Sequence, residues 1–416
     1  MTQMTPKQRL LAALIGTPPD RLPATTHHIM PYYLDRFLPG KSDQDFFDEF
    51  GLDPITWSVP HKPAPDSADY PDPLQGPPGF LESRRVANDN WRVYAEPFAG
   101  PHAASGPRAL SKEPPTRSSP VAGEDAGGDR RKLTRYRFVT PAGALSMVLE
   151  DAEYTCWVVE PLIKQKRDID LIGRYVTTPR CDVEALNRTA DEFGERGLVR
   201  GHICCFDVFG QPGCWQDAAC LVGAQSLILA AHDDPGWVDE LLRILQRRKL
   251  AFIESLAGAR YDILELGGGD ASASVISPRL FDRFVAPYDA PLIEAAHRAG
   301  QRIVYHLCGR IMPMLDRVLD MGVDAIETFT PAGMGGDADL ARAKARIGGR
   351  ASMIGGFDQL HFFMDCDPEA ARAEVRRCFR DAGEDGRYIL SPSDHFFAAR
   401  PELLRAFAEE AKTCTY

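Results

Sequence analysis

The chain has 416 residues, of which 44% are hydrophobic and 26% charged, and a net charge of −11 at pH 7. These proportions are typical of a globular protein and exclude a disordered, collagen-like or coiled-coil chain. The excess of acidic over basic residues argues against binding to nucleic acids or anionic membranes, because both require clustered positive charge.

The first predicted element is a helix near the N-terminus. Thr5 is a suitable N-cap with Gln8 as its capping-box partner, and Pro6 fits the first helical position. Gly16 marks the end of the helix. The apolar run at 10–15 is at the short limit for a signal peptide, and a poor cleavage site follows it. Since no stretch approaches the length of a membrane span, we expect a cytoplasmic protein.

Strand-like and helical segments then alternate along most of the chain. A long helical stretch opens after Ser277 and runs to Gly300. Such alternation is typical of βα units around a parallel sheet. Eight strand positions predict a (β/α)₈ TIM barrel, an α/β fold, with an open doubly wound sheet as the alternative. The predicted strands are 22–26, 52–58, 202–209, 262–266, 302–305, 324–326, 351–354 and 388–390.

A different pattern lies between the second and third predicted strands. Residues 91–95 and 136–149 have β character, and a turn at 140–143 makes the second stretch a hairpin. Residues 100–131 are mainly Gly, Pro, Ser, Ala and charged residues, which predicts a mobile surface loop. We therefore expect one barrel domain over 1–416 with an inserted β-rich segment at 91–150.

The densest group of potential metal ligands is His306-Leu307-Cys308-Gly309, which follows the fifth predicted strand. Alternate residues of an extended strand face the same side, so His306 and Cys308 project together. The carboxyl ends of the strands form the mouth of a (β/α)₈ barrel, where its active site lies. An imidazole and a thiolate presented there are competent zinc ligands. A core cysteine beside a strand-end histidine is the simpler interpretation of this pair taken alone.

Polar residues also end neighbouring predicted strands. Glu327 ends the sixth strand, and Asp394 and His395 follow the eighth. Asp270 follows the fourth strand and could equally cap a helix. Their repetition around one rim favours a functional site at the barrel mouth. Weaker candidates for substrate contact, at or after the ends of other strands, are His27, His28, Gln211 and Gln359.

Short motifs near both ends and in the second half of the chain form a set. The set comprises residues 5–10 (TPKQRL), 19–23 (PDRLP), 277–281 (SPRLF), 306–309 (HLCG), 322–325 (GVDA) and 390–392 (LSP). Together they resemble the uroporphyrinogen decarboxylase-like superfamily over most of the chain except residues 100–131. The resemblance implies a (β/α)₈ barrel with its active site at the mouth.

That superfamily divides by chemistry. True uroporphyrinogen decarboxylases hold a carboxylate-rich substrate largely through an Arg-Gln-Ala-Gly-Arg motif after the first strand. The corresponding residues here, 26–33, include no arginine. His and Met cannot replace the bidentate contacts of a guanidinium group with a carboxylate. Decarboxylation of the porphyrinogen type, which needs no metal, is therefore the second hypothesis.

The other branch consists of zinc-dependent methyltransferases linked to corrinoids or folates. They use a His-x-Cys pair, a glutamate further along the chain and a late cysteine. His306, Cys308 and Glu327 match the first three of these residues. Asp394 stands at the position of the late cysteine and His395 follows it, so the resemblance leaves either as the fourth zinc ligand.

The resemblance therefore implies a zinc-dependent methyltransferase or demethylase that acts on a small methylated compound. Corrinoid (cobalamin), bound to a protein partner, or tetrahydrofolate would carry the methyl group. Glu327 and Asp270 are the predicted catalytic residues, and Asp270 and His28 would contact the substrate. Relatives include dimers, so a homodimer is expected. A non-catalytic barrel that binds a small ligand is a further alternative.

Overall fold

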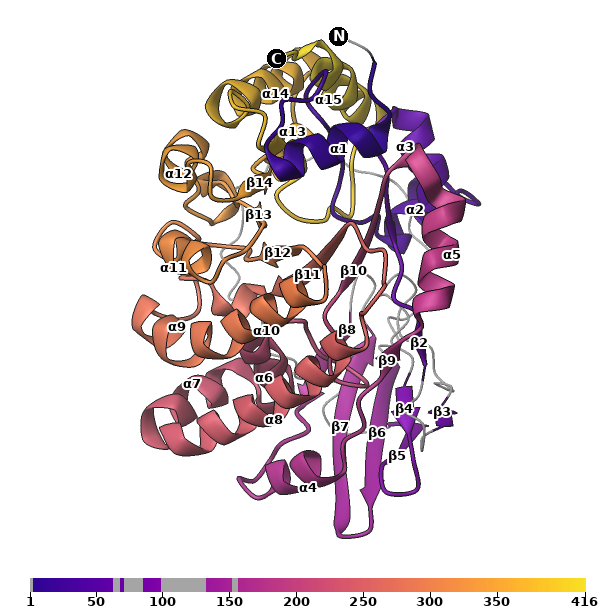
Figure 1. The fold of residues 1–416 in the computed structure, drawn as a ribbon, viewed down its shortest axis with the longest axis vertical. Coiled ribbons are helices and arrows are strands. Elements are labelled where there is room, and N and C mark those ends of the chain that lie inside the picture. The colour runs from indigo at the N-terminus through magenta and orange to yellow at the C-terminus, as the bar shows by residue number, and fades with distance from the viewer. Residues whose placement is uncertain (1–2, 63–67, 71–84, 99–131, 152–155) are drawn as a thin grey trace, which may run out of the picture.

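Seven parallel strands form the central sheet (Figure 1), in the order β1-β10-β11-β12-β13-β14-β15. We describe them in a computed structural model, in which residues 3–62, 68–70, 85–98, 132–151 and 156–416 are described. Each strand runs parallel to its neighbours, as the predicted βα alternation requires. The strands are β1 (Ile55–Trp57), β10 (Leu198–His202), β11 (Ile263–Gly267), β12 (Ile303–His306), β13 (Ala325–Thr328), β14 (Ser352–Gly355) and β15 (Tyr388–Ile389).

The first predicted strand closes this sheet into a barrel, although it forms only an isolated bridge. Ala24 pairs in parallel with Leu390, directly after β15. The backbone N–H of Thr25 donates to the Leu390 carbonyl at 2.9 Å, and the Leu390 N–H donates to the Pro23 carbonyl at 2.9 Å. On its other side, Asp53, just before β1, donates its N–H to the Ala24 carbonyl at 2.7 Å. The segment therefore joins β15 to β1, and the predicted (β/α)₈ barrel is confirmed.

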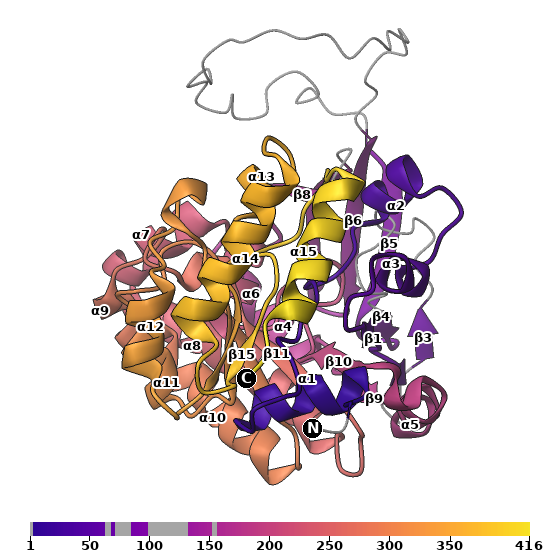
Figure 2. The same ribbon diagram turned by 90° about the horizontal axis from the view of Figure 1, so that it is seen from above.

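Helices surround the sheet on its outer side (Figure 1). In the view of Figure 2, α12, α14 and α15 stand side by side along one flank. No helix in the described ranges is both long and apolar enough to cross a membrane. The helices are α1 (Pro6–Ile15), α2 (Pro31–Phe37), α3 (Asp43–Phe50), α4 (Asp168–Tyr175), α5 (Val183–Phe193), α6 (Cys214–Val222), α7 (Ala224–Asp233), α8 (Pro235–Glu254), α9 (Pro278–Phe284), α10 (Ala286–Arg298), α11 (Leu315–Asp320), α12 (Leu340–Ile347), α13 (Gln359–Phe362), α14 (Pro368–Ala382) and α15 (Pro401–Thr413).

Helix α1 closes the amino-terminal end of the barrel. Its predicted capping box is present, with the Thr5 side chain accepting from the Gln8 backbone and Gly16 as a left-handed C-cap. The buried face of α1 packs on apolar residues of the strands, including Ile55, the first residue of β1. One end of the barrel is thus filled by apolar side chains, and the polar side chains lie toward the other end. The residues of this cluster are Leu10, Ala13, Leu14, Ile55, Leu198, Ile263, Val304, Ala325, Ile354 and Ile389.

The predicted strand at 202–209 is wrong, because the strand is β10 and residues 203–209 follow it as a loop. The apolar residues of this loop are buried outside the sheet. Phe206 packs against Trp91 and Phe138, with ring centroids 6.2 and 6.0 Å apart. The apolar composition that indicated a strand therefore reflects contact with the inserted segment.

The single helix predicted over 277–300 is also wrong, because it divides into α9 and α10 at Val285. Pro287 lies in the first turn of α10, where its missing N–H and fixed φ are tolerated. In a continuous helix the same ring would clash with the preceding turn, so a new helix begins here.

The segment predicted as an insertion at 91–150 contributes three strands of a four-stranded antiparallel sheet, and the fourth, β8, follows it. This sheet lies at the lower end of the molecule in Figure 1. The turn predicted at 140–143 joins β6 to β7. Residues 100–131, predicted as a mobile loop, lie outside the described residues. The strands of this sheet and of two small antiparallel pairs are β5 (Arg92–Pro97), β6 (Lys132–Thr140), β7 (Gly143–Asp151), β8 (Cys156–Glu160), β2 (His61–Lys62) with β9 (Arg180–Cys181), and β3 (Ala68–Tyr70) with β4 (Arg85–Ala87).

Candidate metal centre

Two predicted ligands, His306 and Glu327, meet at the carboxyl ends of neighbouring strands. The register of β12 and β13 sets the two residues directly opposite each other. His306 Nδ1 lies 2.9 Å from Glu327 Oε1, and the side chains are only 12% and 3% exposed. Because the carboxylate accepts the proton of Nδ1, the other ring nitrogen, Nε2, is left for a further contact.

The charges of this pair are set by their surroundings. Burial lowers the pKa of His306, but hydrogen bonds with Cys308 and Glu327 outweigh it and raise the pKa well above the ordinary value. Burial raises the pKa of Glu327, but the positive charge of Arg200 and the neighbouring imidazoles hold that pKa well below its usual range. His306 and Glu327 therefore form a buried ion pair.

His306, Cys308 and Asp394 converge at the barrel mouth, and we call them the His–Cys–Asp group. One potential ligand atom from each lies within 4.8 Å of the other two. Asp394 follows β15, which is separated from β12 by two strands of the sheet. The curvature of the closed barrel thus brings together residues that strand order alone keeps apart. Nitrogen, sulfur and oxygen donors at this spacing form a set that a zinc ion accepts.

Gly269 makes room for the cysteine of this group. It lies just after β11, and a Cβ atom at this position would come within 2.5 Å of Cys308 Sγ. Real Cβ atoms do not approach a sulfur so closely, so any side chain here would displace the thiol. The absence of a side chain at Gly269 therefore helps to set the position of Cys308.

A buried arginine, Arg200 of β10, supports Glu327 from the barrel interior. Its Nη1 donates to Glu327 Oε2 at 2.9 Å, and its Nη2 donates to Glu327 Oε1 at 2.5 Å and to Glu265 Oε2 at 2.6 Å. Its guanidinium carbon lies 4.5 Å from the ring centroid of Trp57. Both oxygens of Glu327 are thus engaged by Arg200, which leaves them little freedom to move.

Sequence reasoning missed Arg200 and Glu265. Both lie within short apolar strands, between Val199 and Gly201 and between Leu264 and Leu266. A charged residue inside such a strand is a usable signal, because burying a charge is costly unless a partner of opposite sign is buried with it.

Three histidines, His27, His28 and His395, form a second group, which we call the three-histidine cluster. His27 Nδ1 lies 3.0 Å from His28 Nδ1, and the rings of His28 and His395 are 4.5 Å apart between centroids. Burial lowers the pKa of His27 and of His28 well below the ordinary value. The cluster borders the His–Cys–Asp group, because Asp394 and His395 are consecutive in the chain.

The other predicted contact residues occupy different positions. Asp270 accepts a hydrogen bond at Oδ2 from Gln216 Nε2 at 2.8 Å, and burial raises its pKa. Gln359 accepts from the backbone and the hydroxyl of Ser393 and thereby holds the loop that carries Asp394. Gln211 forms backbone hydrogen bonds with Asp217 and Lys249. A substrate contact by these residues stays a prediction.

The backbone after Glu327 is strained. Thr328 and Phe329 have φ angles of 91° and 47°, a backbone region that residues other than glycine rarely adopt. The Thr328 hydroxyl donates to the Leu307 carbonyl at 2.8 Å and so joins the loops after β12 and β13. Strain of this kind costs about 1–3 kcal/mol per residue and is concentrated at functional sites.

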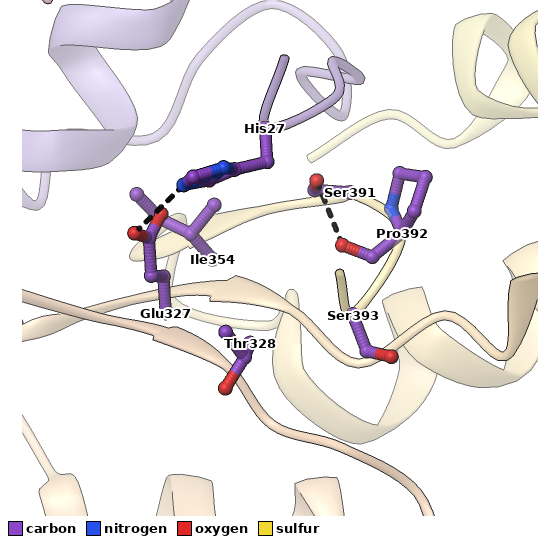
Figure 3. Close-up of a pocket in the computed structure, with 7 residues that line it drawn as sticks. All are labelled: His27, Glu327, Thr328, Ile354, Ser391, Pro392 and Ser393. Atoms are coloured by element: carbon purple, nitrogen blue, oxygen red, sulfur yellow. Dashed lines mark hydrogen bonds and ion pairs between the residues drawn. The ribbon is translucent and has the colours of Figure 1, made fainter. Parts of the chain in front are cut away.

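A small cavity lies beside this backbone (Figure 3). In Figure 3, His27 and Glu327 point toward each other, with His27 Nε2 3.4 Å from Glu327 Oε1, and Ser391–Ser393 lie on the opposite side. The barrel interior next to the candidate site is therefore polar and contains both carboxylate and imidazole groups. The lining residues are His27, Glu327, Thr328, Ile354, Ser391, Pro392 and Ser393.

A closed (β/α)₈ barrel with histidine, cysteine and carboxylate side chains at the carboxyl ends of its strands has the architecture of a barrel enzyme. The family model described as uroporphyrinogen decarboxylase (URO-D) matches residues 139–414. The chain belongs to this family, and the resemblance predicted from its motifs is confirmed.

Solved structures similar to this one include a methyltransferase and a methionine synthase. A methyltransferase from Methanosarcina mazei is 14% identical, with a TM-score of 0.58 over 99% of each chain. A B12-independent methionine synthase from Shewanella sp. W3-18-1 is 12% identical, with a TM-score of 0.38 over 57% of this chain and 72% of that one. No curated protein sequence matches the chain. The likeness to the Methanosarcina protein, at this identity, establishes a shared fold.

Proposed function

We propose that the protein is a zinc-dependent methyltransferase or demethylase that acts on a small methylated compound. The observation that carries this proposal is the convergence of the His–Cys–Asp group at the barrel mouth. The resemblance to the zinc-dependent branch of the superfamily and the fold shared with a methyltransferase support it. The methyl carrier in this proposal is a corrinoid protein or tetrahydrofolate.

The residues present fit a zinc ion. A histidine nitrogen, a cysteine sulfur and a carboxylate oxygen are three of its usual ligands, and three protein ligands leave a fourth position for a substrate. The carboxylate of Glu327 on His306 Nδ1 orients the ring, so zinc would bind at Nε2 and displace the proton that the imidazolium carries there. We assign Glu327 this orienting role, because Arg200 already engages both of its oxygens.

Bound zinc would supply Lewis acidity, which holds a thiol or another heteroatom of the substrate in its reactive anionic form. The protein's own groups position the substrate and manage its protons. Asp270 Oδ2 accepts from Gln216, so Oδ1 is the atom at which Asp270 can take up or release a proton. Burial raises the pKa of Asp270, which makes its carboxylate a better proton acceptor than an exposed one. His28, which is partly exposed at the mouth, would contact the substrate or its methyl carrier.

Metal analysis combined with a methyl-transfer assay tests this proposal. Cys308→Ser and His306→Ala should each lose one equivalent of zinc per chain relative to the wild type. Both should also lose transfer of a methyl group from methylcobalamin or methyltetrahydrofolate to small thiols. Cys366→Ser and His297→Ala are matched controls, since both residues lie outside the metal-ligand groups and should retain metal and activity. Full activity of the wild type after removal of all metal would contradict the proposal.

Replacing Gly269 with alanine should weaken zinc binding by about 10-fold or more, which is the scale seen when outer-shell support of a metal site is lost. The added methyl group would displace Cys308 Sγ, while the backbone at this position suits alanine. Titration with a competing chelator measures the change. Gly349→Ala is the control, because a Cβ there meets no atom within 4 Å. Equal zinc affinity in both variants would show that Gly269 has no role in the site.

Porphyrinogen decarboxylation is the second candidate, and the name of the matching family favours it. Residues 26–33 contain no arginine, and Arg200 is already paired with two carboxylates. Release of carbon dioxide from a porphyrinogen by the metal-free protein would support this candidate over methyl transfer.

A further inference from the structure

The three-histidine cluster lies beside the proposed zinc site but supplies none of its ligands. We propose that His27, His28 and His395 form a second metal site, which takes a divalent first-row cation such as Zn²⁺, Co²⁺ or Ni²⁺. Imidazole nitrogen suits these ions, whereas Mg²⁺ and Ca²⁺ prefer oxygen ligands. The inference is independent of which reaction the enzyme catalyses.

The geometry of the cluster matches such a site. One ring nitrogen from each histidine lies within 4.8 Å of the other two. The centroid of the His27 ring is 4.7 Å from that of His28 and 5.8 Å from that of His395. Metal–nitrogen bonds of about 2.0–2.1 Å place neighbouring ligand atoms a little over 3 Å apart, so only small side-chain rotations are needed.

His27 is held from behind by a carboxylate and a guanidinium group. Its Nε2 lies 3.1 Å from Glu265 Oε2 and 3.2 Å from Arg200 Nη2. Its Nδ1 faces His28 Nδ1 at 3.0 Å, so one of these two nitrogens offers a lone pair toward the cluster. A histidine whose second ring nitrogen is held by a carboxylate has the usual outer shell of a metal ligand.

His395 also has a nitrogen with an unused lone pair or proton. Its Nδ1 is buried and has no hydrogen-bond partner among the described residues. Asp394 Oδ1 lies 3.1 Å from this nitrogen, but the two groups are not oriented for a hydrogen bond. Asp394 Oδ1 accepts instead from the backbone N–H of His395. Buried polar atoms without partners are rare, and a bound ion is one explanation for them.

The charges around the cluster favour a cation over an anion. The carboxylates of Glu265 and Glu327 carry two negative charges, and Arg200 and His306 carry one positive charge each. Asp394 adds another negative charge next to His395. An anionic ligand would be repelled by this balance, whereas a divalent cation would be attracted. The same two glutamates are less suited to bind the ion directly, because the guanidinium group lies between them.

Titration of the metal-free full-length protein with Co²⁺ tests the second site. We expect the wild type to bind two equivalents, with a thiolate-to-cobalt charge-transfer band from the His–Cys–Asp group. His28→Ala and His395→Ala should each lose one equivalent and keep this band. Cys308→Ser should lose the band and keep one equivalent. His297→Ala, in which an exposed histidine bound to Asp324 is removed, should behave as the wild type.

The two proposals fail in different ways. A single equivalent in the wild type, together with none in Cys308→Ser, would overturn the second site and leave the first intact. If the wild type binds one equivalent without the charge-transfer band, and His28→Ala loses that equivalent, the His–Cys–Asp site would be overturned. The three-histidine site would stand. His28 and His395 are partly exposed, and the thermal unfolding of their variants provides the check that the fold persists.

Discussion

Replacing Arg200 with methionine is expected to lower the free energy of unfolding by about 3–5 kcal/mol. The arginine is 1% exposed and pairs with Glu265 and Glu327, which are 11% and 3% exposed. Its removal leaves two carboxylates buried in the barrel without their positive partner. Equilibrium unfolding in urea should show a lower midpoint with an unchanged slope.

A variant that also neutralises the two unpaired carboxylates is the control for this prediction. Arg200→Met combined with Glu265→Gln and Glu327→Gln should recover part of the lost stability, because neutral amides cost less to bury than unpaired carboxylates. If the triple variant is no more stable than Arg200→Met, lost packing against Trp57 is the cause of the destabilisation. The buried ion pairs would then contribute little.

Replacing Lys249 with methionine should also destabilise the protein by about 3–5 kcal/mol. Its ammonium group, 1% exposed on α8, lies 2.8 Å from Asp217 Oδ2 of α6 and donates to the carbonyls of Cys204 and Gln211. Burial lowers the pKa of Lys249, but the charge of Asp217 outweighs it and raises the pKa above the ordinary value. The lysine is therefore charged at neutral pH, and its loss removes the cationic partner of Asp217 Oδ2 and the donor to two carbonyls. The urea midpoint measures the change.

The exposed pair between Lys166 and Asp234 is a matched control, because its side chains are 64% and 38% exposed. Lys166→Met should change the stability by at most about 1 kcal/mol. A similar change for both lysine variants would contradict a special role for burial. Since Lys249 also fixes the loop from Cys204 to Gln211, its loss should make the loop after β10 more susceptible to proteolysis.

Local sequence patterns predicted the βα alternation and most strand positions. The strands of the second half of the barrel were predicted well, because they are short apolar segments that alternate with helical stretches. The capping box of Thr5 and Gln8 is another local feature, and it is present in α1. The loop after β10 was predicted wrongly, because Phe206 and its neighbours are buried against the inserted sheet and mimic a strand.

The candidate site was only partly predictable. The spacing of His306 and Cys308 is local, and the parallel pairing of β12 and β13 brings Glu327 next to them. The role of Arg200 was not predictable from its neighbours in the chain. Its partners Glu265 and Glu327 come from other strands. Arg200 pairs with them only because the barrel buries all three side chains together.

The sequence by itself determined that the chain is a βα barrel of the uroporphyrinogen decarboxylase family and that a histidine and a cysteine project together from one strand end. Hydrophobic periodicity, caps and motif spacing act over a few residues, so they can be recognised without the fold. The tertiary structure alone decided that Asp394 meets His306 and Cys308 and that three histidines gather beside them. These contacts depend on closure of the barrel between β15 and the segment at Ala24, which brings the two ends of the chain to the same rim.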